Sequence, residues 1–177
     1  QAHGGLRGGA DERRTVTILF ADISGFTAMS EKLDPEVVQE IMDHAFERLT
    51  AVITGYGGTI DKYIGDAVMA LFGAPVALGD DPERAVRAGL GMQQAMIAYA
   101  EELKRIRGFG LAMRVGVNTG KVIWGRVGGA GEKSFTVMGD AVNLASRLEH
   151  AAPLGGVLIG EATQRHVRTR FALEALE

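Results

Sequence analysis

Two kinds of hydrophobic pattern alternate along the chain. Residues 15–21 form a β-branched, apolar run that is typical of a buried strand. The polar, glycine-containing segment 22–27 follows, and we expect a turn there. From Asp34 to Gly55, apolar positions recur with a helical period, which predicts a helix with one face in the core. An Asp-Pro-Glu sequence suits the start of this helix, and glycines suit its end.

The remaining elements follow from the same two patterns. Residues 59–64 and 67–72 flank Gly65-Asp66 and predict a β-hairpin. A second Asp-Pro-Glu sequence, at 81–83, opens a long helix that reaches about residue 107. The rest of the chain is predicted to contain strands at 113–117 and 121–127 on either side of 118–120, a loop at 128–131, a strand at 135–137, a helix at 140–151, a strand at 157–159, a helix at 161–167 and a last strand at 171–176.

This order of elements predicts an α+β fold, an α/β sandwich in which helices flank a mostly antiparallel sheet. Hairpin connections imply antiparallel pairing, which argues against a doubly wound parallel sheet. A length of 177 residues suits one domain. Residues 1–12 contain four glycines and little apolar content, so we interpret them as a linker or an expression remnant and place the domain at 13–177.

Composition and charge exclude several classes of protein. The 25 glycines follow no Gly-X-Y period, and the absence of cysteine excludes disulfide frameworks and cysteine nucleophiles. A net charge of −3, without a basic stripe or an aromatic platform, gives no reason to expect nucleic-acid binding. The longest nearly apolar run, 67–78, is too short to span a bilayer. We expect no direct membrane contact, and either a cytoplasmic protein or a cytosolic domain of a larger signalling protein.

Two aspartates follow predicted strands and are candidates for a metal site. Asp22 follows the strand 15–21, and Asp66 lies in the tip of the hairpin. If the two strands are neighbours, both carboxylates emerge at one edge of the sheet. Paired oxygen ligands suit Mg²⁺ or Mn²⁺, and two such ions can clamp a phosphoryl group. The alternative is that both are ordinary turn aspartates, because Asp readily hydrogen-bonds its own backbone in turns.

Four separated blocks of sequence decide between these alternatives. They read FADISGFT at 20–27, KYIGDA at 62–67, MRVGVNTG at 113–120 and VMGDAVNLASR at 137–147. Together they resemble the catalytic domain of class III nucleotidyl cyclases, in the right order over residues 14–176. The resemblance implies that family's ferredoxin-like or palm-type fold. One departure is that the sequence ends at Glu177, before the final hairpin with a Lys-Gly-Lys-like phosphate contact into which the family continues.

The resemblance implies roles for the metal and base positions. Asp22 and Asp66 would bind two divalent ions, Mg²⁺ or Mn²⁺, with help from the carbonyl of Ile23. The family's purine-selecting positions fall on Lys62 and Thr136. Lysine in this position goes with adenine, while threonine is similar to the bacterial and soluble-type adenylyl cyclase branch that is often activated by bicarbonate. A threonine hydroxyl can still accept a hydrogen bond from the adenine amino group. Taken singly, either residue also fits an ordinary strand position.

The resemblance also implies a catalytic pair. Asn143 would orient the ribose and Arg147 would stabilise the pentavalent phosphorus, and a spacing of four places them on one face of a helix. Arg114 matches an arginine that contacts the triphosphate. The histidines lie outside the matching motifs, so we interpret them as surface or helix residues.

Substrate binding is further implied for Gly25, Phe26 and Thr27, because the turn after Asp22 offers backbone N–H groups to phosphates. The family builds each site across a head-to-tail dimer, so a homodimer is implied. One protomer would hold the metals and phosphates, and the other would supply the base-reading and transition-state residues.

The function that the resemblance implies is adenylate cyclase activity, which converts ATP to cyclic AMP and pyrophosphate. One alternative is a degenerate domain that binds nucleotide or bicarbonate and only regulates a partner. Another is guanylate cyclase activity, which Lys62 disfavours.

Overall fold

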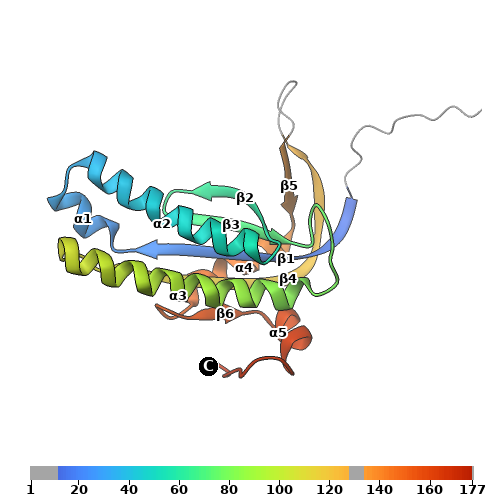
Figure 1. Ribbon diagram of the computed structural model, residues 1–177. Coiled ribbons are helices and arrows are strands. Elements are labelled where there is room, and N and C mark those ends of the chain that lie inside the picture. Colours follow the sequence, from blue (N-terminus) through green and yellow to red (C-terminus); the bar gives the residue numbers. More distant parts are fainter. Residues whose placement is uncertain (1–11, 128–133, 177) are drawn as a thin grey trace, which may run out of the picture.

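A split β-α-β arrangement forms the centre of the molecule (Figure 1). The computed structural model describes residues 12–127 and 134–176. The central elements are β1 (Glu12–Ser24), α2 (Pro35–Gly55), β2 (Thr59–Ile64), β3 (Ala67–Phe72), α3 (Asp81–Arg107) and β4 (Ala112–Val127). The other elements are α1 (Phe26–Lys32), β5 (Ser134–Met138), α4 (Asp140–Ala151), β6 (Val157–Ile159) and α5 (Glu161–Val167).

One sheet contains all the described strands. Its order is β2-β3-β1-β4-β5, and β6 pairs with β4. The neighbours along this order are antiparallel, and β6 alone among the described strands runs parallel to its partner. The predicted α+β fold with a mostly antiparallel sheet is therefore confirmed, and the parallel β6 makes the sheet a mixed one.

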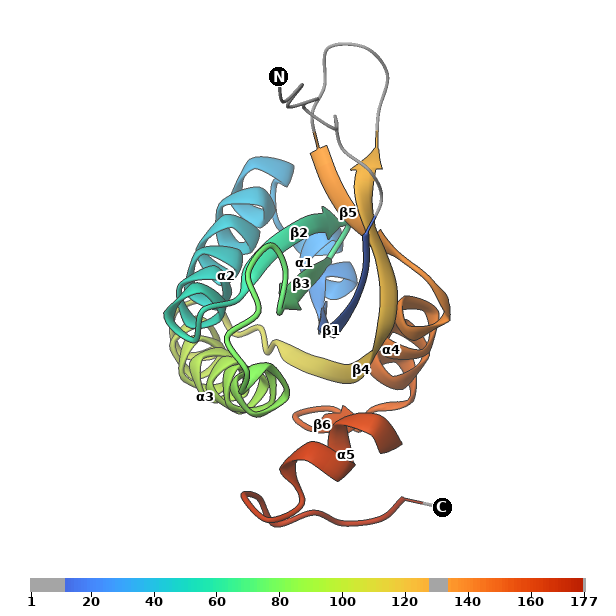
Figure 2. The ribbon, with the colours of Figure 1, turned by 90° about the vertical axis from the view of Figure 1, so that its right-hand side faces the viewer.

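Helices cover both faces of the sheet (Figure 2). Along β1, Leu19 and Ala21 face the core formed with α2 and α3, while Ile18 and Phe20 face the core formed with α4. Successive side chains of a strand point to opposite faces, so a strand buried on both sides needs apolar residues at every position. This is why five of the six residues at 16–21 are apolar, and the exception, Thr17, is buried with its hydroxyl 2.9 Å from that of Thr119.

Strand β4 is one continuous strand, so the prediction of two short strands at 113–117 and 121–127 is wrong. It runs without a break through 118–120 and pairs with β1 over residues 112–124. Asn118 and Thr119 are buried, although their polarity suggested a turn. The Asn118 side chain donates to the carbonyl of Ala141 at 3.0 Å, and the Thr119 hydroxyl lies 2.9 Å from those of Thr17 and Thr163. Tertiary partners satisfy these polar groups, so the strand continues.

Two further segments also differ from expectation. The turn expected at 22–27 instead contains the end of β1 and the start of the short helix α1. The last strand expected at 171–176 is irregular chain, and it runs beyond α5 away from the main sheet (Figure 1). The guanidinium carbon of Arg87 on α3 lies over the ring of Phe171, 5.2 Å from the ring centroid. This contact holds the segment on a helix.

The first strand begins earlier than the predicted domain boundary. Residue 12 was assigned to the linker, but it already belongs to β1 and pairs with Trp124. Residues 1–11 of that linker and the loop expected at 128–131 lie outside the described residues. Strand β1 extends three residues beyond the predicted 15–21 at each end, and the other predicted helices and strands are present within a residue or two of their expected bounds.

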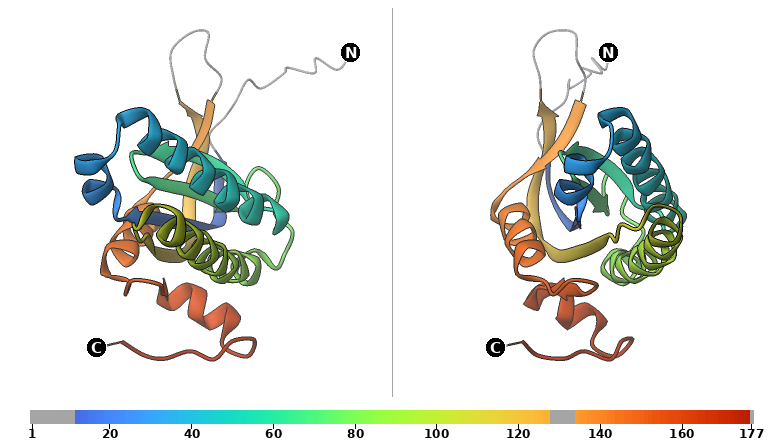
Figure 3. Two further views of the ribbon diagram at one scale, coloured as in Figure 1. Left: turned by 60° about the vertical axis from the view of Figure 1, so that its left-hand side comes forward. Right: turned by 90° about the vertical axis from the view of Figure 1, so that its left-hand side faces the viewer.

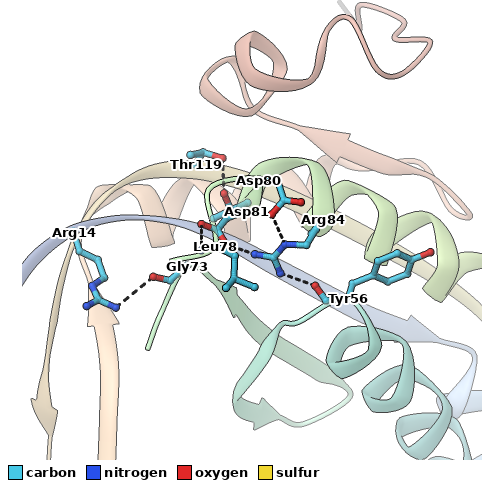
Figure 4. Close-up of polar contacts among 9 residues, drawn as sticks. Arg14, Tyr56, Gly73, Leu78, Asp80, Asp81, Arg84 and Thr119 are labelled. Atoms are coloured by element: carbon cyan, nitrogen blue, oxygen red, sulfur yellow. Dashed lines mark hydrogen bonds and ion pairs between the residues drawn. The ribbon is translucent and has the colours of Figure 1, made fainter. Parts of the chain in front are cut away.

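Arg84 ties the two helices of one face together (Figure 4). Its guanidinium donates to the Asp80 carboxylate at 2.8 Å and to the carbonyl of Tyr56, after the end of α2, at 2.6 Å. It also forms an ion pair with Asp81, whose side chain is largely buried. One side chain therefore fixes the start of α3 against the end of α2.

On the opposite face, α4 lies directly against the backbone of β4 (Figure 3). A Cβ atom built on Gly116 would lie 2.3 Å from the backbone nitrogen of Glu149 and 2.8 Å from the carbonyl oxygen of Ala145. Any larger residue would have to push the helix outward. The absence of a side chain at Gly116 thus sets the position of α4.

We expect Gly116→Ala to destabilise the fold, because its methyl group would meet helix backbone that cannot rotate away. Forced overpacking of this kind costs about 1–3 kcal/mol, measurable as a loss of unfolding free energy in urea. Gly55→Ala is the control, since no atom lies within 4 Å of a Cβ built there. Equal stability of Gly116→Ala and the wild type would contradict the close packing of α4 on β4.

Candidate active site

The two candidate metal-binding aspartates lie on neighbouring strands. Asp22 is near the end of β1, opposite Ala67 of β3, and Asp66 precedes Ala67 in the β2–β3 turn. The backbone N–H of Ile23 donates to the carbonyl of Asp66 at 3.0 Å. The metal-site hypothesis required these two strands to be neighbours, and they are. The antiparallel pairing of β1 with β3 brings both carboxylates to one end of the sheet.

The surroundings of Asp22 disfavour a bare negative charge. Burial raises the pKa of the Asp22 carboxyl above its ordinary value, and the nearby charge of Asp66 raises it further. His150, Arg114 and a hydrogen bond with Glu149 oppose this rise in pKa. The site therefore concentrates acidic groups and compensates them only in part.

Arg114 supplies part of that compensation from β4. It lies directly across from Asp22 in the β1–β4 register. Its Nε donates to the carbonyl of Ala152 at 3.0 Å, and its Nη1 lies 3.5 Å from the hydroxyl of Ser24. These contacts hold the guanidinium beside the carboxylates at the end of the sheet.

Glu149 is a residue of this site that sequence reasoning missed. It is only 4% exposed, and its Oε1 has no hydrogen-bond partner among the described residues. Burial raises the pKa of its carboxyl, and Asp22 raises it further. The adjacent His150 is exposed and lies 3.5 Å from Glu149 Oε2. The helical spacing of four from the buried Ala145 is the signal that could have identified Glu149 as inward-facing.

The chemistry of this end of the sheet fits divalent cations. Asp22 and Asp66 provide hard oxygen ligands, and a cation would relieve the repulsion that raises the pKa of Asp22. No group of three or more His, Cys, Asp or Glu side chains able to hold a metal occurs within residues 12–127 and 134–176. A metal bound by the two aspartates would therefore need further ligands, such as backbone carbonyls, water or phosphate oxygens.

The two base-reading candidates converge although they come from opposite ends of the strand order. Lys62 lies on β2 and Thr136 on β5, and curvature of the sheet brings these strands together (Figure 2). The Thr136 hydroxyl donates to Asp61 Oδ2 at 3.0 Å, and the Lys62 ammonium lies 3.6 Å from the same oxygen. Asp61, which sequence reasoning did not select, joins them.

The remaining candidates lie on helices. Asn143 and Arg147 are both exposed on α4, and neither forms a hydrogen bond or ion pair with another described residue. Gly25 precedes α1 with a φ of 117°, and Thr27 is exposed in its first turn. The side chain of Phe26 is buried in the core, so only its backbone is available to a substrate.

Residues 9–177 match the family described as adenylate and guanylate cyclase catalytic domain, and the chain belongs to this family. An adenylate cyclase of Anabaena cylindrica is 38% identical over 167 residues, which are 90% of this chain and 32% of that protein. The chain thus spans about a third of that relative.

Two solved structures have the same fold and differ in their nucleotide. The adenylyl cyclase CyaB from P. aeruginosa superposes with a TM-score of 0.85 at 35% identity, covering 91% of this chain and 84% of that chain. The guanylyl cyclase Cya2 superposes with a TM-score of 0.82 at 38% identity, covering 88% and 79%. Overall similarity therefore does not discriminate between adenine and guanine. Within the described residues, no helix has the length and apolar character needed to cross a membrane.

The raised pKa of Glu149 predicts how stability depends on pH. Because the native carboxyl keeps its proton to higher pH than the unfolded chain does, the native state binds more protons in that interval. Stability therefore falls as the pH rises from the ordinary carboxyl pKa through the raised value. We expect Glu149→Gln, measured in chelator, to gain stability over the wild type across this interval.

Urea unfolding from about pH 4 to 8 tests this expectation, with the exposed Glu101→Gln as the control. The Glu101→Gln curve should run parallel to the wild-type curve, whereas the Glu149→Gln curve should be flatter. Parallel curves for all three proteins would contradict the raised pKa.

Proposed function

We propose that this domain is an adenylate cyclase, which converts ATP to cyclic AMP and pyrophosphate. The observation that carries the proposal is the convergence of Lys62 and Thr136 at Asp61. An ammonium donates hydrogen bonds, and a hydroxyl whose proton is already donated can accept one. The Watson–Crick edge of adenine presents the complementary pair, an acceptor at N1 and a donor at the amino group. The adenylate cyclase names of the relatives support the same substrate.

The acidic end of the sheet would hold the triphosphate. Asp22 and Asp66, with the carbonyl of Ile23, are the ligands for two divalent ions, Mg²⁺ or Mn²⁺. Such ions lower the pKa of the ribose 3′-hydroxyl and neutralise phosphate charge when they are bound. Arg114 contributes a fixed positive charge beside them, and the backbone of residues 25–27 offers N–H groups to phosphate oxygens.

The reaction is one displacement at the α-phosphorus. The ribose 3′ oxygen forms a bond to phosphorus, the bond to the pyrophosphate oxygen breaks, and the hydroxyl proton passes to solvent. Asn143 orients the ribose, and Arg147 stabilises the negative charge that accumulates on the phosphoryl oxygens. Preorganised electrostatic stabilisation of this kind is usually the largest contribution to catalysis.

Two chains arranged head to tail would form two such sites. Asn143 and Arg147 are exposed and have no partner within the described part of their own chain, which suits residues that act on a nucleotide held by a second copy. In this arrangement one chain supplies the aspartates, and its partner supplies the base-reading and transition-state residues. Activation by bicarbonate, which the Thr136 branch resemblance implies, stays a prediction.

A second candidate function is guanylate cyclase activity, because Cya2 is as similar to this chain as CyaB is. Turnover of ATP and GTP by the purified domain with Mg²⁺ or Mn²⁺ separates the two functions. We expect kcat/KM for ATP to exceed that for GTP at least tenfold, since a guanine would leave both polar partners mismatched. Equal or greater turnover of GTP would overturn the adenine assignment, and turnover of neither would favour a regulatory domain.

The same assay tests the metal ligands. Asp22→Asn should lower kcat by about 10²-fold or more, because the pair of carboxylates loses one charge where the phosphate-bound cations must sit. Glu101→Gln, an exposed carboxylate on α3, should retain wild-type turnover. Similar rates for Asp22→Asn and the wild type would remove Asp22 from the mechanism.

Mixing two inactive variants tests the shared site. Asp22→Ala and Arg147→Ala should each be inactive, and their mixture should recover roughly a quarter of wild-type activity. Random pairing makes half of the dimers mixed, and each mixed dimer has one intact site of two. The matched control mixes Asp22→Ala with Asp66→Ala, which damage the same half of each site and should recover nothing. Recovery in neither mixture, with mixed dimers present, would contradict the composite site.

A further inference from the structure

Asp61 is a buried carboxylate whose position is not explained by the fold alone. The β2–β3 register shifts between Ile60 and Lys62, so Asp61 occupies an irregular position of the strand. Its side chain is 2% exposed, whereas the side chain of the adjacent Lys62 is 48% exposed. Burying a carboxylate is unfavourable unless hydrogen bonds and opposite charge compensate it.

The partners of Asp61 are the two proposed base-reading residues, and both approach one oxygen. The Thr136 hydroxyl lies 3.0 Å from Oδ2, and the Lys62 ammonium lies 3.6 Å from it. An ionised carboxylate accepts hydrogen bonds and has none to donate. The Thr136 proton must therefore point toward Asp61, which leaves the lone pairs of the hydroxyl for a ligand.

This orientation determines what Thr136 can recognise. A free hydroxyl rotates and serves as donor or acceptor, so by itself it would accept adenine or guanine at this position. With its proton held by Asp61, Thr136 accepts from the adenine amino group but has nothing to donate to the guanine O6. Lys62, held by the same oxygen, has only donors to offer, which suits N1 of adenine and opposes the N–H of guanine.

We infer that Asp61 is a positioning residue that makes the base-reading pair specific for adenine, by fixing the donor direction of Thr136 and anchoring Lys62. This inference rests on the proposed adenylate cyclase function. Asp61 itself does not contact the nucleotide, and its effect passes through its two neighbours.

Asp61→Asn tests the inference with little change of shape. The amide can donate to the Thr136 oxygen, which frees the Thr136 proton to point toward the base. We expect the ratio of kcat/KM for ATP to that for GTP to fall about tenfold, which corresponds to the loss of one well-placed hydrogen bond. The KM for ATP should change more than the kcat for ATP does. Glu101→Gln should leave the ratio unchanged.

A double-mutant cycle shows whether Asp61 acts through Thr136. Thr136→Val removes the hydroxyl, so adding Asp61→Asn to it should change the ratio by much less than Asp61→Asn does in the wild type. Two independent, additive effects would overturn the mechanism, and so would an equal loss of activity toward both nucleotides in Asp61→Asn.

The outcome for the wild type keeps the two proposals separate. If the wild type turns over neither nucleotide, or prefers GTP, the proposed function fails. If it prefers ATP and Asp61→Asn keeps that preference, only the role of Asp61 fails. Melting temperatures report folding, and Asp61→Ser replaces the amide variant if that variant does not fold. Failure of both to fold would assign Asp61 to stability and overturn the inference.

Discussion

The pairing of β1 with β3 on one side and β4 on the other is the constraint on which the rest of the structure depends. Both faces of β1 are buried, so a shift of one residue would turn its apolar side chains to the wrong cores. The same register places Asp22 opposite Ala67 on one neighbour and opposite Arg114 on the other. The packing of hydrophobic residues thereby sets the distances between charged groups at the end of the sheet.

Curvature of the sheet is the second condition for the site. A flat sheet would keep β2 and β5 four strands apart, but they meet at the hydrogen bond between Thr136 and Asp61. Twist and coiling are intrinsic to β-sheets, and long strands such as β4 accumulate them. Two regions with opposite requirements result. One brings together the carboxyl groups of Asp22 and Glu149, whose pKa values are raised by burial, and the other brings Lys62 and Thr136 together at Asp61.

Elements with a strong local signal were predictable. The β2–β3 hairpin has a Gly-Asp turn pair between two strand-like segments, and α2 and α3 each have an Asp-Pro-Glu start and a long apolar period. The predictions failed where the structure of a segment depends on contacts with residues that are distant in the sequence. Asn118 and Thr119 read as a turn because their partners, Ala141, Thr17 and Thr163, are remote in sequence. Residues 171–176 read as a strand, although the described sheet offers them no partner.

The sequence by itself determined the family, through four motifs in order, and it selected the residues that we propose for metal, base and ribose. It did not select Asp61, which lies at an irregular position of β2, and it marked Glu149 as inward-facing only through the helical spacing of four from Ala145. Only the tertiary structure decided that both carboxylates are buried, and that one meets Thr136 and the other Asp22. The physical reason is that desolvation and hydrogen-bond direction depend on neighbours brought together by the folded sheet, and local sequence does not encode them.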